Sequence, residues 1–176
     1  MNYSFPQILA EKVADQRRFF FSSAGISALN PRKSAGNLSD TRRKLLFSTM
    51  HENEITFLIR GAIFKVYNTL SPGLLESSYE AALGYELVKS GLMVEHQVGL
   101  PMIYEDLKLD VGYRLDLLVE KKVIVEIKSV ESLAEVHYKQ LVTYLRLSGL
   151  KVGLLVNFNS AEIAQSIHRR VNNFKD

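Results

Sequence analysis

The stretch RLDLLVEKKVIVEIK, residues 114–128, decides the fold, because it consists of two apolar strands joined by a short charged turn. Side chains alternate between the two faces of a strand. In the first strand, one face carries Leu115, Leu117 and Val119, and the other carries Arg114, Asp116 and Leu118. In the second strand, Glu126 and Lys128 share a face with Ile124. The sequence therefore predicts an aspartate, a glutamate and a lysine within a largely apolar sheet.

The turn predicts how these two strands pair. A three-residue hairpin loop, residues 120–122, is one of the common short connections between antiparallel strands. The pairs expected from it are Val119 with Val123, Asp116 with Glu126, and Arg114 with Lys128. A two-residue loop would place Asp116 and Glu126 on opposite faces, since a slip of one residue reverses every side chain.

Two carboxylates in this register would lie roughly 5 Å apart at Cβ and repel each other. Lys128 supplies one positive charge, and a divalent cation is a natural second. The alternative is that Glu126 and Lys128 belong to the solvated edge of an amphipathic strand. Their strand is apolar on both faces, as in a covered central strand, and buried charge is costly unless it is paired or binds a metal. This pattern favours the metal site.

Composition limits the remaining possibilities. A chain of 176 residues suits one domain with a sizeable core. The absence of cysteine excludes disulfides, thiolate zinc sites and a cysteine nucleophile, and it is compatible with the cytoplasmic location that we expect. No apolar run approaches the ~18 residues of a membrane span, so we expect no membrane association.

The net charge of +3 is unevenly distributed. Residues 1–49 carry eight basic and three acidic side chains, whereas residues 50–176 carry 14 basic and 16 acidic ones. We expect residues 1–49 to form a basic leader, either a flexible tail or an upstream extension outside the working domain. Its Arg17-Arg18 pair and its many serines faintly resemble export and transit signals. A general basic surface for nucleic acid is absent from the rest of the chain.

Hydrophobic periodicity predicts the other elements. Helices are expected over residues 51–70, 74–91 and 134–148, with a terminal helix over 161–172. Strands are expected over residues 93–104, 109–119, 123–129 and 151–158, the first interrupted at Pro101. The strand–helix–strand order of residues 123–158 requires a parallel pair. The sequence therefore predicts an α/β sandwich with a mixed sheet.

This order of elements, with an aspartate on the second strand and Glu-x-Lys on the third, resembles the PD-(D/E)XK nuclease superfamily. Within it, the chain is similar to the GxxExxY family from about residue 50 to residue 173. The motifs that carry the resemblance are GLLESSY (73–79), GYRLD (112–116), VEIK (125–128), HYKQLVTY (137–144) and GLLVNF (153–158). The departures are Ser71, where the family often has glycine, and Leu115, where the superfamily name has proline.

The resemblance implies a restriction-endonuclease-like αβββαβ core over residues 50–176. It implies Mg²⁺ or Mn²⁺ held by Asp116, Glu126 and the backbone oxygen of Ile127, which suits a cation that prefers oxygen ligands. Lys128 would orient the attacking water or neutralise the phosphate. It also implies that Glu76 reaches the metal directly or through water, although a glutamate at a helix start is equally well explained by the helix dipole.

Gln140 and Tyr144 are four residues apart and share a helix face. This Gln-x-x-x-Tyr pattern resembles the additional motif of exonuclease-like members, where it lines the site. For His137, a phosphate contact and an ordinary surface position both stay open, and Arg114 could pair with a site carboxylate or contact phosphate.

Two functions follow as alternatives. The first is a Mg²⁺-dependent nuclease acting on phosphodiesters, with DNA favoured over RNA and an exonuclease-like preference for ends. The second is a non-catalytic nucleic-acid or protein-binding module that retains the fold. The complete set of Asp116, Glu126 and Lys128 favours the enzyme. The acidic character of residues 50–176 indicates weak or assisted binding of DNA, through a protein partner or a homo-oligomer.

Overall fold

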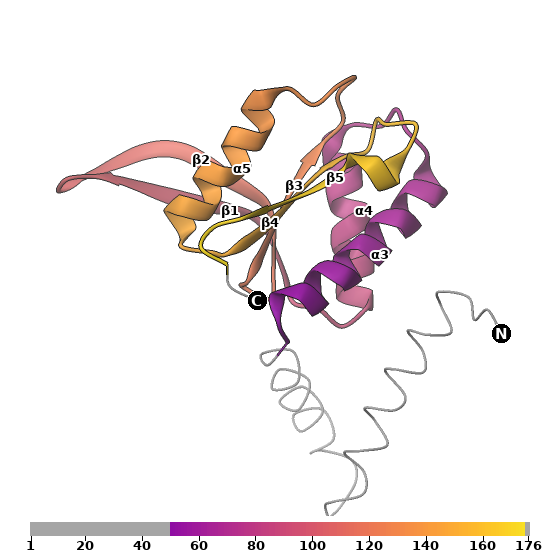
Figure 1. Ribbon diagram of the computed structural model, residues 1–176, viewed down its shortest axis with the longest axis horizontal. Helices are drawn as coiled ribbons and strands as arrows, with labels where there is room; N and C mark the ends of the chain where they lie inside the picture. The colour runs from indigo at the N-terminus through magenta and orange to yellow at the C-terminus, as the bar shows by residue number, and fades with distance from the viewer. Residues whose placement is uncertain (1–49, 175–176) are drawn as a thin grey trace, which may run out of the picture. The chain divides into compact units, whose positions relative to one another are not determined.

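The computed structural model describes residues 50–174, and residues 1–49, with the expected leader and its signals, lie outside them. The described chain forms three α-helices and five strands, with one short 3₁₀ turn (Figure 1). In chain order these are α3 (Glu52–Leu70), α4 (Glu76–Lys89), β1 (Val94–Tyr104), β2 (Leu107–Val119), β3 (Val123–Lys128), α5 (Glu135–Ser148), β4 (Val152–Asn157), η1 (Ile163–Ser166) and β5 (Ile167–Val171).

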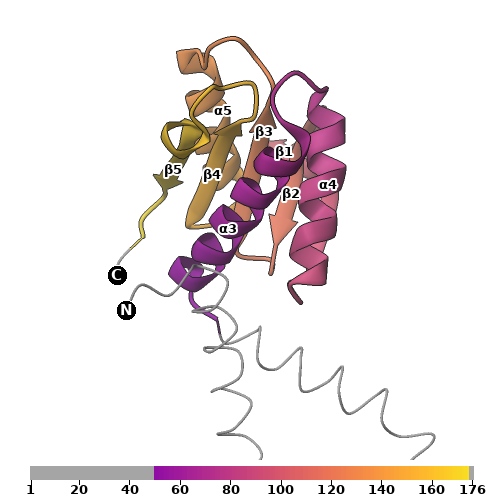
Figure 2. The same cartoon turned by 90° about the vertical axis from the view of Figure 1, so that its right-hand side faces the viewer.

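The strands form one mixed sheet in the order β1-β2-β3-β4-β5. Only the central β3–β4 pair is parallel, joined through α5, and the other three pairs are antiparallel. Helices α3 and α4 cover one face of the sheet and α5 covers the other (Figures 1 and 2). This arrangement confirms the predicted α/β class and the restriction-endonuclease-like core.

Strand β3 contributes to both hydrophobic cores, because it is covered on both faces. Val123, Val125 and Ile127 pack in the larger core with α3 and α4. Ile124 packs in the smaller core with Leu141 of α5. Since side chains alternate, Glu126 lies on the face of Ile124 and points into the layer beneath α5. Glu126 is thus buried between the sheet and α5.

Local signals place the helix ends close to the predicted boundaries. The N-cap His51 accepts the backbone N–H of Asn53 through Nδ1, and Glu54 accepts the backbone N–H of His51. At the C-terminal end of α5, Gly149 adopts a φ of 70°, which only glycine reaches without strain.

The β2–β3 hairpin has the predicted loop. Glu120 and Lys121 adopt φ values of 52° and 55°, and Lys122 N–H donates to Val119 O over 3.0 Å. The β2–β3 ladder then runs from Val119–Val123 to Leu117–Val125. Loop and register are therefore confirmed. The two outer pairs predicted from this register are not part of the ladder, because β2 diverges from β3 beyond Leu117.

The divergence also corrects the predicted faces of β2. We expected Leu115, Leu117 and Val119 on one face, but Leu115 packs in the core under α5 and Leu117 in the opposite core. Arg114 pairs with Gly99 of β1 instead of lying opposite Lys128. Strand β2 therefore changes faces at Asp116. On the N-terminal side of Asp116, β2 pairs with β1 in a hairpin that extends away from β3 (Figure 1).

The predicted terminal helix over residues 161–172 is wrong. Its apolar residues Ile163, Ile167 and Val171 are four apart, a spacing that a helix and a strand can each bring to one face. The structure instead has one 3₁₀ turn followed by β5, which pairs antiparallel with β4 from Val156–Ile167 to Val152–Val171. The backbone of β4 needs partners on this side, and that tertiary demand outweighs the local pattern. None of the helices in residues 50–174 is long and apolar enough to cross a membrane.

Candidate nuclease site

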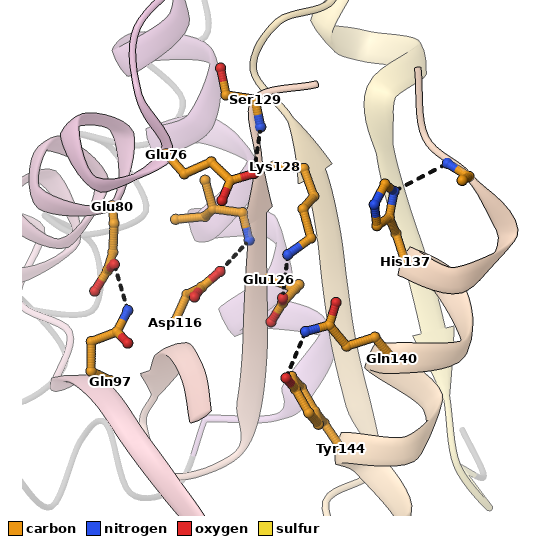
Figure 3. Close-up of polar contacts among 12 residues, drawn as sticks. Glu76, Glu80, Gln97, Asp116, Glu126, Lys128, Ser129, His137, Gln140 and Tyr144 are labelled. Atoms are coloured by element: carbon orange, nitrogen blue, oxygen red, sulfur yellow. Dashed lines mark hydrogen bonds and ion pairs between the residues drawn. The ribbon is translucent and has the colours of Figure 1, made fainter. Parts of the chain in front are cut away.

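The predicted charged residues meet where β2 leaves β3 (Figure 3). Lys128 Nζ donates to Glu126 Oε1 over 2.7 Å, and the two side chains are only 14% and 2% exposed. On the other side of the strand, Ile127 N–H donates to Asp116 Oδ2 over 2.8 Å. The Asp116 carboxylate thus takes the place of the backbone acceptor that a continued ladder would have supplied.

One oxygen of Glu126 has no hydrogen-bond partner in the part of the chain that the structure describes. Its Oε2 atom is buried and accepts no hydrogen bond from the described residues. A buried carboxylate oxygen without a donor costs free energy. A cation bound to this oxygen would offset that cost.

The pKa values reflect this crowding of acids. Burial, and then the neighbouring Asp116, raises the pKa of Glu126 to about 7. Burial also raises the pKa of Asp116, against the opposing effects of the Ile127 N–H and of Lys128. Burial alone would lower the pKa of Lys128, but the hydrogen bond to Glu126 and the surrounding carboxylates outweigh it and raise the pKa. Each carboxyl group resists ionising until positive charge is added.

A divalent cation fits these donors. The described residues contain no group of three His, Asp or Glu side chains placed to hold a metal. The two carboxylates Asp116 and Glu126 are supplemented by the carbonyl of Ile127, which points to the same side of β3 as its N–H group. Two carboxylates and a carbonyl suit Mg²⁺, which keeps several of its own waters.

Glu76 lies at the rim of the site. It is the first residue of α4, is exposed, and accepts the backbone N–H of Ser129 over 3.0 Å through Oε1. Its charge nevertheless acts on Asp116, Glu126 and Lys128. The residue therefore joins the start of α4 to the end of β3, and its direct role towards a metal stays a prediction.

Gln140 and Tyr144 reach the site from α5. Gln140 Nε2 donates to the Tyr144 hydroxyl over 2.6 Å, which confirms that they share a helix face. Burial raises the pKa of Tyr144, and the charges of Glu126 and Asp116 add to this effect. The pair thus borders the carboxylates on the side opposite α4 (Figure 3).

The remaining two candidates are His137 and Arg114. His137 Nδ1 accepts the backbone N–H of Ala134 over 3.1 Å, which caps its own helix. The side chain of Arg114 is exposed. Both residues remain available for a phosphate contact, which stays a prediction.

The sequence patterns did not reveal Glu80 and Gln97, which lie beside Asp116. Glu80 is one helical turn after Glu76, and its charge raises the pKa of Asp116. Gln97 of β1 donates to Glu80 through Nε2 over 2.7 Å. The four-residue spacing of Glu76 and Glu80 was the one available signal.

Comparison with known proteins agrees with this geometry. A search of curated proteins and a search of solved structures each found no significant match. The profile of one family matches residues 53–171, about two thirds of the chain, and covers every element from α3 to β5. Its description is the PD-(D/E)XK nuclease superfamily. The chain, with its aspartate on β2 and Glu-x-Lys on β3, therefore belongs to the PD-(D/E)XK nuclease superfamily.

Proposed function

We propose that the protein is a Mg²⁺-dependent nuclease that hydrolyses phosphodiester bonds in DNA. The observation that carries this proposal is the buried Glu126 carboxylate. One of its oxygens accepts from Lys128, and the other has no hydrogen-bond partner within residues 50–174. A structural ion pair would be expected to satisfy both oxygens. A divalent cation beside Asp116 would bind the Glu126 oxygen that has no other partner among the described residues.

The proposed roles follow from the contacts. Asp116, Glu126 and the Ile127 carbonyl would hold the ion, which supplies activation of a water and neutralisation of phosphate charge. Lys128, held by Glu126, would place its ammonium group against the anionic charge that develops on the phosphate. The Tyr144 hydroxyl and the amide of Gln140 would orient water or a phosphate oxygen from the α5 side.

The preference for DNA and for strand ends rests on the Gln-x-x-x-Tyr pattern of α5, which resembles exonuclease-like members. Residues 50–176 carry a net charge of −2, so electrostatic attraction to a long duplex is weak. A protein partner or a second copy of the chain would then help to hold the substrate. Mn²⁺ would be expected to replace Mg²⁺, since it accepts the same oxygen donors.

The test is cleavage of linear, circular and single-stranded DNA, and of RNA, by the full chain in Mg²⁺, Mn²⁺ or EDTA. Asp116→Ala and Lys128→Ala should each lower the rate on the order of 10²–10³-fold. Lys139→Ala is the matched control, because its ion pair with Glu135 is exposed at the surface of α5. Cleavage that survives both site substitutions would come from another site or a contaminant. Binding without cleavage under all conditions would instead support a non-catalytic binding module.

A further inference from the structure

Strand β1 is irregular opposite Asp116. The β1–β2 ladder pairs His96 with Leu117 and Val98 with Leu115, but it skips the position between them, where Gln97 faces Asp116. Gln97 has a φ of 49°, in the left-handed region that non-glycine residues seldom adopt. Such a conformation persists only where surrounding contacts hold it.

The contacts that hold Gln97 come from α4. Gln97 Nε2 donates to Glu80 Oε2 over 2.7 Å (Figure 3). The other carboxylate oxygen of Glu80 lies 3.2 Å from His96 Nδ1. A hydrogen bond to an ionised carboxylate is stronger than one between neutral groups. Glu80, His96 and Gln97, here called the β1–α4 cluster, thus fasten the irregular part of β1 to the helix.

The close fit of this cluster depends on Gly84. A Cβ atom at this position would lie 2.3 Å from His96 Cε1, well inside contact distance. Glu80 and Gly84 are four residues apart, so the carboxylate and the gap that receives the imidazole share one face of α4. The imidazole of His96 therefore packs against Gly84 of α4, next to the Glu80 carboxylate that accepts from Gln97.

The irregularity determines where Asp116 points. Without a regular partner on β1, and past the end of the β2–β3 ladder, Asp116 directs its carboxylate to the backbone N–H of Ile127. We infer that the β1–α4 cluster positions Asp116, with Glu80 and Gln97 acting through the backbone and not as ligands. The metal-binding purpose of this positioning rests on the proposed function, but the positioning itself does not.

The competing possibility is that Glu80 binds the ion or the substrate directly. Two substitutions separate these roles. Glu80→Gln keeps an acceptor for Gln97 and removes the charge, whereas Glu80→Ala removes both. Glu86→Ala is the control, since Glu86 lies on the same helix and pairs with Lys65 instead.

The experiment is amide hydrogen exchange of the full chain in EDTA, followed by NMR. Val125, opposite Leu117 in the intact ladder, reports folding of the same strand. We expect Ile127 N–H to exchange about 10-fold faster in Gln97→Ala and Glu80→Ala. Exchange at Val125 should be unchanged, and Glu80→Gln and Glu86→Ala should retain protection at Ile127. Unchanged exchange at Ile127 in both alanine variants, with Val125 protected, would overturn the inference.

Calorimetric titration with Mg²⁺ gives the second readout. If Glu80 acts mainly by positioning, Glu80→Ala and Gln97→Ala weaken binding of the ion more than Glu80→Gln, which removes only the charge. Equal weakening by Glu80→Gln and Glu80→Ala would show that the charge of Glu80, and not its hydrogen bond to Gln97, acts on the ion, and would overturn the inference. Because the exchange measurement uses the metal-free protein, an absence of nuclease activity would count against the proposed function and leave this test intact.

Discussion

Lys128 donates to one oxygen of Glu126 over 2.7 Å, while among the described residues the other oxygen of Glu126 has no donor. The pair is therefore incomplete although both side chains are largely buried. The energetic cost of this arrangement depends on the protonation state of Glu126 and on any cation near it.

The first prediction concerns pH. The pKa of Glu126 is raised from 4.5 to about 7 in the folded protein, so the folded state holds its proton more tightly than the unfolded chain. The resulting stabilisation is complete below pH 4.5 and is lost as the pH rises through 7. Glu126→Gln should therefore stabilise the metal-free protein at pH 8, on the order of 1–3 kcal/mol, and have little effect at pH 4.5.

Urea unfolding in EDTA at pH 4.5, 6 and 8 measures this difference. Glu135→Gln is the control, since its exposed side chain should produce no such trend. A gain in stability from Glu126→Gln that is equal at all three values would contradict the raised pKa.

The second prediction concerns the cation. If Mg²⁺ binds the folded site and not the unfolded chain, as proposed, then at about 100 times its Kd it should stabilise the protein by about 2.7 kcal/mol. Asp116→Asn should abolish this stabilisation, and Glu86→Gln should leave it intact. Thermal unfolding with Mg²⁺ and with EDTA gives the comparison. An equal Mg²⁺ effect in wild type and Asp116→Asn would place the ion elsewhere.

The third prediction concerns α5. Tyr144→Phe removes the hydroxyl that accepts from Gln140 and leaves the ring in its core. We expect cleavage to slow about 10-fold, in line with loss of one group that orients a water or phosphate oxygen, with a smaller effect on folding. Tyr138→Phe is the matched control on the same helix, because Tyr138 contacts His168 instead. Equal rates for the two variants would argue against a role for the hydroxyl.

The fourth prediction concerns the hairpin loop. Lys121 is exposed and has a φ of 55°, a conformation that costs a side chain free energy and costs glycine little. Lys121→Gly should raise the free energy of unfolding by about 1 kcal/mol. Lys139→Gly, in the middle of α5, should lower it by about as much. Chemical denaturation of both variants tests the pair, and a destabilised Lys121→Gly would refute the predicted loop geometry.

The hairpin and the central sheet could be predicted from the sequence because their signals are local. A charged three-residue turn between alternating strands fixes the register from Val119–Val123 to Leu117–Val125. The Glu-x-Lys pair followed from the same alternation, since the strand is apolar on both faces. These features depend on neighbours within about fifteen residues of sequence.

The remaining features depend on distant segments. The left-handed conformation of Gln97 is held by Glu80, which no pattern within β1 can indicate. The change of faces between Leu115 and Leu117 follows from the divergence of β2 and β3. The four-residue apolar spacing within residues 163–171 cannot separate the predicted terminal helix from β5, because a helix and a strand can each bring it to one face.

Strand β5 protects the edge of a buried strand. Every residue of β4 is buried, and its outer edge is paired by β5 alone. A chain in which β5 is detached would leave VGLLVN with open backbone groups along that edge, a template for pairing with other molecules. Local opening of β5 would therefore be enough to make the protein prone to aggregation while the rest of the sheet stays folded.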